Sequence, residues 1–202
     1  MKKLNEVLTS EDLLKIEKKA RKKMDEKRFL HTSGVRFTAA SMAMAHGADI
    51  MKAQAAGLLH DIVKQTSDEE KLDMAEYYGM TISDFERKNP FIIHGPLAAH
   101  YAAEKFGITD QDLLNAITYH TTGRPAMSVL EQIIFIADYI EPARDKVKEL
   151  PYYRKMAFQD LDETCYLILD NTLNYLSGAK REVDDMSRQA YLYYKQVHEG
   201  EI

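Results

Sequence analysis

The sequence predicts an all-α protein. Only nine of its 202 residues are glycine and five are proline, and runs of β-branched residues are few. Apolar residues recur at the three- and four-residue spacing of a helix, as in Leu13, Ile16, Ala20 and Met24. With 45% apolar residues, a chain of this length suits one domain with a substantial core.

Composition and charge exclude several classes of function. The net charge is −5, whereas a protein whose main ligand is nucleic acid usually has a basic domain. Cys165 is the only cysteine, so neither an internal disulfide nor a thiolate metal cluster is expected. No run reaches the roughly 18 apolar residues of a membrane span, and no signal peptide is recognisable. We therefore expect a cytoplasmic protein that binds neither nucleic acid nor membrane.

Two helices are expected before Gly47. The first spans 10–28, with Ser10 as its N-cap and a charged, largely basic outer face that contacts solvent. The second is rich in small residues and ends near Gly47, a suitable residue for a helix C-terminus. His31 is expected near the start of this second helix.

Capping residues and helix breakers indicate the later helices. Asp49 is expected to begin a helix that carries the adjacent pair His60 and Asp61. The other expected helices span 67–79, 96–107, 110–120 and 129–142, and their capping or first-turn residues are Ser67, Pro96, Thr109 and Ser128. Two final helices over 158–177 and 185–200 carry aromatic and aliphatic residues that indicate packing.

Several ionisable residues fall on apolar helical faces or at helix ends, where an unpaired polar group would cost several kcal/mol. Neighbouring side chains of a helix lie about 100° apart, so His60 and Asp61 can converge on one ion. Asp138 lies in a helix that is apolar nearly all round, which implies a partner for its carboxylate. The complete set is His31, His60, Asp61, His94, His120 and Asp138. Four imidazoles and two carboxylates suit one or two divalent first-row metals: iron, manganese, cobalt or zinc.

Cationic side chains near this set indicate an anionic substrate. Lys64 lies one turn after His60 and Asp61 and is expected on their helical face. His94 lies at a helix N-terminus, where backbone N–H groups attract anions. Three further candidates closely follow a proposed ligand in the chain: Thr121, Arg124 and Arg144. Each of these residues could instead be an ordinary surface or helix-end group. A metal that activates water, together with cations that neutralise phosphate, is a combination suited to phosphoryl transfer.

The sequence around these residues resembles HD-domain metal-dependent phosphohydrolases, in particular the symmetrical bis(5'-nucleosyl)-tetraphosphatases. The matching blocks are RFLHT (28–32), AGLLHDIVK (56–64), HGP (94–96), AITYHTTGR (116–124) and IADYIEPAR (136–144). The resemblance implies a single HD-domain helical bundle over residues 1–202. Its motif-bearing core would span about 27–145, with C-terminal helices over about 158–200 packing on it.

The resemblance also implies a bacterial enzyme that cleaves diadenosine tetraphosphate into two ADP by attack of a metal-bound hydroxide. By this likeness His31, His60, Asp61 and Asp138 hold a first ion, expected to be iron. Asp61 would bridge to a second ion on His94 and His120; with only one ion, these two histidines would contact phosphate instead. The expected catalytic residues are Asp61 and Lys64. The expected substrate-binding residues are Lys64, His94, His120, Thr121, Arg124 and Arg144.

Two other functions stay open on the sequence alone. One is an HD phosphohydrolase acting on mononucleotides or guanosine alarmones, because the same metal set serves these substrates. The other is a nucleotide-binding regulatory module without turnover, although the complete ligand set argues against it. The expected partner is a small dinucleoside polyphosphate, and the sequence also allows a homodimer.

Overall fold

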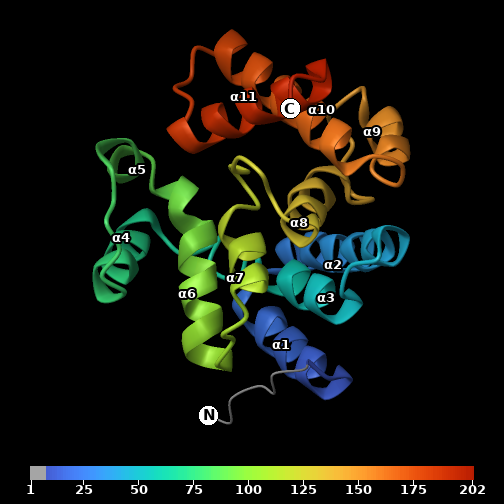
Figure 1. The fold of residues 1–202 in the computed structure, drawn as a ribbon. Helices are drawn as coiled ribbons and strands as arrows, with labels where there is room; N and C mark the ends of the chain where they lie inside the picture. Colours follow the sequence, from blue (N-terminus) through green and yellow to red (C-terminus); the bar gives the residue numbers. More distant parts are fainter. Residues whose placement is uncertain (1–7) are drawn as a thin grey trace.

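The structure, a computed structural model, describes residues 8–202, and within this range it contains helices and no strand (Figure 1). The all-α prediction is therefore confirmed. The helices are α1 (Ser10–Lys23), α2 (Glu26–His46), α3 (Ile50–Leu59), α4 (Asp68–Tyr77), α5 (Asp84–Lys88), the 3-10 helix η1 (Pro90–Ile93), α6 (His94–Phe106), α7 (Gln111–Thr118), α8 (Val129–Ile140), α9 (Leu150–Met156), α10 (Leu161–Gly178) and α11 (Asp185–Glu199). No helix in residues 8–202 is long and apolar enough to cross a membrane.

Most helix ends follow the expected capping signals. Asp49 caps α3 by accepting hydrogen bonds from two backbone N–H groups. Ser67 and Ser128 each form a full capping box, at the starts of α4 and α8. The α2 helix ends at Gly47, whose φ of 69° lies in the left-handed region that favours glycine.

Two expectations about the first helices are wrong. The helix predicted over 10–28 is interrupted, because Asp25 accepts a hydrogen bond from the backbone of Arg28 and begins α2. His31 therefore lies in the second turn of α2. The N-cap of α1 is Thr9 rather than Ser10, because Thr9 forms a capping box with Asp12.

The structure also differs from the predicted one near His60 and near His120. The α3 helix ends at Leu59, and 60–65 form tight turns, so Asp61 and Lys64 do not share a helical face. Asp110, not Thr109, caps α7, because its carboxylate accepts a hydrogen bond from the backbone of Leu113. The short helices α5, η1 and α9 escaped prediction because each has seven residues or fewer and shows no clear apolar period.

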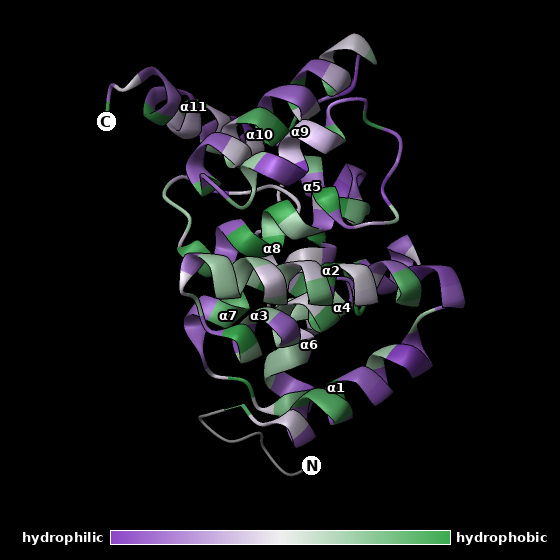
Figure 2. Ribbon diagram, turned by 90° about the vertical axis from the view of Figure 1, so that its right-hand side faces the viewer, coloured by the Kyte–Doolittle hydropathy of each residue, from purple (hydrophilic) through white to green (hydrophobic). Residues whose placement is uncertain are grey.

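The α8 helix lies at the centre of the molecule. It packs between α2 and α10, and it is coloured as mostly hydrophobic in Figure 2. Residues 133, 134, 136 and 137 of α8 are completely buried. The helices α2, α3 and α7 pack against it, α6 packs on α7, and α11 packs on α10 (Figure 1). This packing brings the C-terminal ends of α3, α7 and α8 toward one region of the molecule.

The C-terminal helix is tied to the segment before α8 by a buried tyrosine. The Tyr194 hydroxyl accepts hydrogen bonds from the backbone N–H of Met127, at 3.1 Å, and from Gln132 Nε2, at 3.2 Å. Ala190, on the same helix, lies against Gly123. The α11 helix thus supports the loop between α7 and α8. The division of the chain into one domain stays a prediction.

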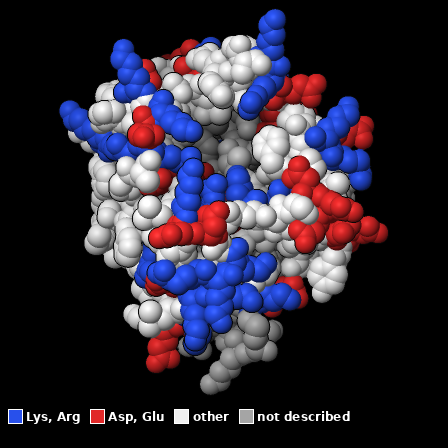
Figure 3. Space-filling view, turned by 180° about the vertical axis from the view of Figure 1, so that it is seen from behind, with Lys and Arg blue, Asp and Glu red and all other residues white. Residues whose placement is uncertain are grey.

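The α1 helix has the basic, exposed face that was expected. Figure 3 shows Lys and Arg side chains gathered at the end of the molecule that α1 occupies in Figure 1. Within α1, Lys15 pairs with Asp12 and Arg21 pairs with Glu17.

A close approach of α2 and α3 gives a test of the fold. A Cβ atom on Gly57 would lie 2.8 Å from the Cα atom of Arg36. We expect Gly57→Ala to lower the free energy of unfolding by about 1–3 kcal/mol, because two backbones would have to separate. Denaturant unfolding measures this change. The control Gly178→Ala, where nothing lies within 4 Å, should change stability by less than about 1 kcal/mol. Equal effects of the two substitutions would contradict the packing argument.

Candidate metal centre

The six predicted ligand residues lie together, brought from five parts of the chain. They come from α2 (His31), the turn after α3 (His60 and Asp61), the first residue of α6 (His94), the turn after α7 (His120) and α8 (Asp138). Their nitrogen and oxygen atoms face one another in two adjoining groups. All except Asp138 are buried, and the Asp138 side chain is 21% exposed.

The first group contains His31, His60 and Asp138. The Nε2 atom of His31 lies 3.0 Å from Asp138 Oδ1 and 3.4 Å from His60 Nε2. The Nε2 atom of His60 is 4.0 Å from the same Asp138 oxygen. One ion could therefore contact an atom of each residue.

The second group contains His94 and His120, whose Nε2 atoms are 2.9 Å apart. The carboxylate of Asp61 lies between the two groups. Its Oδ1 atom is 3.1 Å from His94 Nε2 and 3.6 Å from His120 Nε2. Its Oδ2 atom faces the first group, at 3.4 Å from His60 Nε2 and 3.7 Å from His31 Nε2. Asp61 could therefore bind an ion held by either group, or ions held by both.

Hydrogen bonds at the far side of each imidazole fix which nitrogen carries the proton. In three histidines, Nδ1 forms a hydrogen bond with the carbonyl oxygen three residues earlier: His60 with Gly57, at 2.7 Å, His94 with Phe91, and His120 with Ile117, at 2.7 Å. In His31, Nδ1 forms a hydrogen bond with Glu141 Oε1, at 3.1 Å. A carbonyl or carboxylate oxygen only accepts, so each Nδ1 donates and each Nε2 of the neutral ring presents a lone pair.

Four lone pairs that converge in this way repel one another unless a cation lies between them. The buried Oδ1 atom of Asp61 supports the same conclusion. It has no hydrogen-bond partner, although it lies only 3.1 Å from His94 Nε2. Neither atom has a proton to share, so the contact is not a hydrogen bond. The donor set therefore fits a divalent metal ion, and the outward-facing bonds are those that orient metal-bound histidines.

The charges around the centre keep its carboxylates ionised. Burial alone would raise the pKa of Asp61, but the adjoining imidazoles of His60, His120 and His94, once protonated in acid, hold that pKa well below its usual range. Burial opposes ionisation of Asp138 as well, and a hydrogen bond from the protonated ring of His31 outweighs it and lowers the pKa. Two anionic carboxylates are the form that metal binding requires.

Three of the predicted substrate-binding side chains border this centre. Lys64 Nζ is 2.9 Å from His94 Nε2 and 3.8 Å from Asp61 Oδ1. Arg144 Nη2 is 2.6 Å from Asp138 Oδ1. The hydroxyl of Thr121 lies 3.0 Å from His120 Nε2.

Arg124 has a structural partner instead. Its Nε and Nη2 atoms bond the two carboxylate oxygens of Glu131 at 2.7 and 2.6 Å. Glu131 also forms the capping box of α8 with Ser128. Arg124 thereby fastens the loop after His120 to α8, and its role in substrate binding stays a prediction.

Two residues at the centre were not predicted from the sequence. Arg28 Nη1 lies 2.7 Å from Asp61 Oδ2, and Glu141 accepts the hydrogen bond from His31. Both carried a signal that could have found them. Arg28 precedes His31 by three residues on α2, which places the two side chains on one face. Glu141 follows Asp138 by the same interval.

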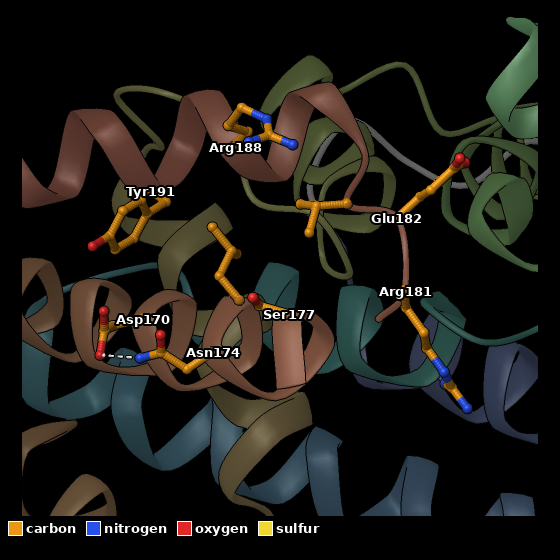
Figure 4. Close-up of a pocket in the computed structure, with 9 residues that line it drawn as sticks. Asp170, Asn174, Ser177, Arg181, Glu182, Arg188 and Tyr191 are labelled. Atoms are coloured by element: carbon orange, nitrogen blue, oxygen red, sulfur yellow. Dashed lines mark hydrogen bonds between the residues drawn. The ribbon is translucent and has the colours of Figure 1, made fainter. Parts of the chain in front are cut away.

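A polar cavity of about 370 Å³ lies apart from these residues, between α10 and α11 (Figure 4). Arg181 and Arg188 border it, and Asn174 bonds Asp170 along one wall. None of the six predicted ligands lines this cavity.

The buried His94 gives a test that needs no metal. Burial lowers the pKa of His94 to about 4; its contact with Asp61 opposes this change, and His120 and Lys64 add to it. In metal-free protein we expect His94 to titrate near pH 4 by NMR, with the resonance assigned through His94→Asn. Between about pH 6.5 and 4 the unfolded chain binds a proton that the folded chain does not. The free energy of unfolding should therefore fall as pH decreases through this window. A midpoint near 6.5 would contradict the buried, neutral imidazole.

Comparison with known proteins identifies the family. A family model described as "HD domain" matches residues 28–143. The chain is 36% identical over 163 residues to the "Bis(5'-nucleosyl)-tetraphosphatase, symmetrical" of Bacillus subtilis, covering 81% of this chain and 87% of the relative. It is 40% identical over 162 residues to the protein of that name from Halalkalibacterium halodurans, covering 76% and 81%.

A solved structure shows the same fold. It is described as a "predicted HD superfamily hydrolase involved in NAD metabolism" from Clostridium acetobutylicum. The TM-score is 0.88 at 36% identity, and the match covers 95% of this chain and all of that one. The match to the HD-domain model and the length and identity of the relatives' alignments establish that this chain belongs to the HD-domain symmetrical bis(5'-nucleosyl)-tetraphosphatase family.

Proposed function

We propose that this protein is a metal-dependent hydrolase that cleaves dinucleoside tetraphosphates symmetrically, converting diadenosine tetraphosphate and water into two ADP. The observation that carries the proposal is the convergence of four Nε2 lone pairs and two carboxylates at one centre bordered by cations. The names of the relatives from Bacillus subtilis and Halalkalibacterium halodurans support the choice of substrate.

We propose two ions, because the two oxygens of Asp61 face two different histidine groups. His31, His60, Asp138 and Asp61 Oδ2 would hold the first, and His94, His120 and Asp61 Oδ1 the second. Nitrogen and oxygen ligands without thiolate suit iron, our preferred metal, and are compatible with manganese, cobalt or zinc. If only one ion binds, His94 and His120 would contact phosphate.

When bound, such ions lower the pKa of a coordinated water toward neutrality and offset negative charge on phosphate. The chain's own residues would then position the substrate. Lys64 lies beside the carboxylate of Asp61 and Arg144 beside that of Asp138, where each can neutralise phosphate oxygens. The Thr121 hydroxyl can donate a hydrogen bond to a phosphate oxygen. Phosphoryl transfer depends mainly on positioning and charge neutralisation. Apart from holding the metal, the side chains would therefore contribute to catalysis through these contacts with phosphate.

A cytoplasmic location and a homodimer are further parts of the proposal. The net charge of −5 favours a small substrate over nucleic acid as the partner. No observation on residues 8–202 favours a mononucleotide, a guanosine alarmone or a purely regulatory role over the tetraphosphate.

The first test removes the shared carboxylate. Asp61→Ala should lower turnover of diadenosine tetraphosphate by more than about 100-fold, because loss of an outer partner of a ligand already costs 10–100-fold. Chromatography of the products should show two ADP per substrate for the unmodified protein. Asp73→Ala, at an exposed position on α4, is the control and should keep full activity. Full turnover by Asp61→Ala with verified metal content, or inorganic phosphate as the main product, would overturn the proposal.

The second test counts the ions. Elemental analysis after anaerobic purification should find two ions per chain, and one in His120→Ala, because this substitution removes a ligand of the second group only. His100→Ala, at an exposed histidine stacked on Tyr78, should keep two ions. A single ion in the unmodified protein that His120→Ala retains would favour the one-metal arrangement.

A further inference from the structure

We propose that Glu141 is a positioning residue, which fixes the ring of His31 and makes the first group the tighter of the two metal sites. This inference rests on the proposed function and orders its two ions by affinity. It arises from a difference among the four histidines: the outer partner of His31 is a carboxylate, whereas the other three have backbone carbonyls.

The Glu141 side chain is buried, and both of its oxygens are held. It is only 3% exposed. Oε1 accepts the hydrogen bond from His31 Nδ1 at 3.1 Å, and Oε2 accepts one from the backbone N–H of Ala143 at 2.7 Å. The backbone is fixed too, because Glu141 ends α8 and its carbonyl accepts a hydrogen bond from Arg154 Nη2 at 3.0 Å. Rotation of the carboxylate away from His31 would therefore break a second hydrogen bond as well.

A glycine in α2 makes room for this carboxylate. Gly34 lies in the interior of α2, three residues after His31. A Cβ atom on Gly34 would lie 2.5 Å from Glu141 Oε2 and 3.2 Å from its Cδ atom. Glycine is less favourable than alanine inside a helix. Its presence at this position is explained by the Glu141 side chain, which passes α2 there to reach His31.

The carboxylate distinguishes His31 from the other histidines of the centre. A backbone carbonyl contributes a dipole, whereas Glu141 contributes a full negative charge. A carboxylate as outer partner orients a metal-binding histidine and strengthens donation from its Nε2 atom. In the first group, His31 Nε2 lies 3.0 Å from Asp138 Oδ1. Glu141 would therefore strengthen binding of the first ion through His31, without being a ligand itself.

The first group also has more ligands than the second. It has three members of its own, the second group has two, and the two groups share Asp61. In the second group, Lys64 Nζ lies 2.9 Å from His94 Nε2, where its positive charge repels an ion. The number of ligands and the charge therefore both favour the first group.

Two arginines partly offset the negative charge of the first group. Arg28 Nη1 lies 2.7 Å from Asp61 Oδ2, and Arg144 Nη2 lies 2.6 Å from Asp138 Oδ1. Glu141 adds a third carboxylate to these two pairs, so the surroundings of the first ion keep a net negative charge. Loss of that carboxylate should weaken the first ion and leave the second unchanged.

Removal of metal from the holoenzyme by a chelator tests this assignment without relying on turnover. The anaerobically purified protein is dialysed against increasing chelator, and elemental analysis gives the ions retained per chain. The unmodified protein should release one ion first and the other at a higher chelator concentration. In Glu141→Gln, the concentration that removes the tighter ion should fall about 10- to 100-fold, as for other outer partners of metal ligands. The weaker ion should leave as before.

Further variants assign the ions and control for the substitution. His120→Ala should retain the tighter ion only. Gly34→Ala should resemble Glu141→Gln, because the added Cβ displaces the carboxylate from His31. The matched controls are Glu149→Gln, at an exposed position, and Gly178→Ala, where nothing lies within 4 Å of the added Cβ. Both controls should release metal as the unmodified protein does.

The ion that is lost separates positioning from a general structural role. Unchanged release in Glu141→Gln, or equal weakening of both ions together with a lower free energy of unfolding, would overturn the inference. A single ion per chain, or two ions released together by the unmodified protein, would contradict the difference in affinity. Two ADP from an unmodified protein whose metal release does not depend on Glu141 would refute only this inference. An unmodified protein that holds no metal or forms no ADP would refute the proposed function and this inference together.

Discussion

The hydrogen bonds from histidine Nδ1 to backbone carbonyls are the interactions on which the rest of the centre depends. The last carbonyls of a helix have no intrahelical partner. His60 and His120 use such carbonyls at the ends of α3 and α7, so that one bond completes the helix end and orients the ring. The ring can then present Nε2 in one direction only. The free carbonyls found at every helix end thus fix the direction of Nε2 in His60 and His120.

The helical packing brings these ends together. The central α8 carries Asp138, and the helices around it supply the other side chains from chain segments far apart in sequence. The polar atoms lie within an apolar core, where an unpaired charge would be costly. Opposite charges and outward hydrogen bonds satisfy most of them, and Asp61 Oδ1 is left without a donor. The unsatisfied atom is the one that a bound cation in the proposed metal centre would contact.

The fold class and the six ligand candidates could be predicted from sequence because each depends on a local pattern. Helical periodicity and caps such as Ser128 reflect interactions within four residues, and an isolated Asp138 on an apolar helix indicates a missing partner. Boundaries were less predictable where two caps compete. Thr9 and Ser10 both qualify chemically, and the position of Asp12 decides between them. The partners of Arg28 and Arg124 depend on tertiary contacts, which no local pattern contains.

The hydroxyl of Tyr194 reaches back across 67 positions of the chain to the backbone of Met127. All six ligand candidates precede residue 139, so a ribosome has made them long before it adds α11. Until that helix docks, the segment after His120 lacks one of its anchors. Contacts between residues so distant in sequence tend to form late in folding, because a long loop must be closed first. The ligand candidates are therefore synthesised early, whereas α11, which supports the segment after His120, is synthesised near the end.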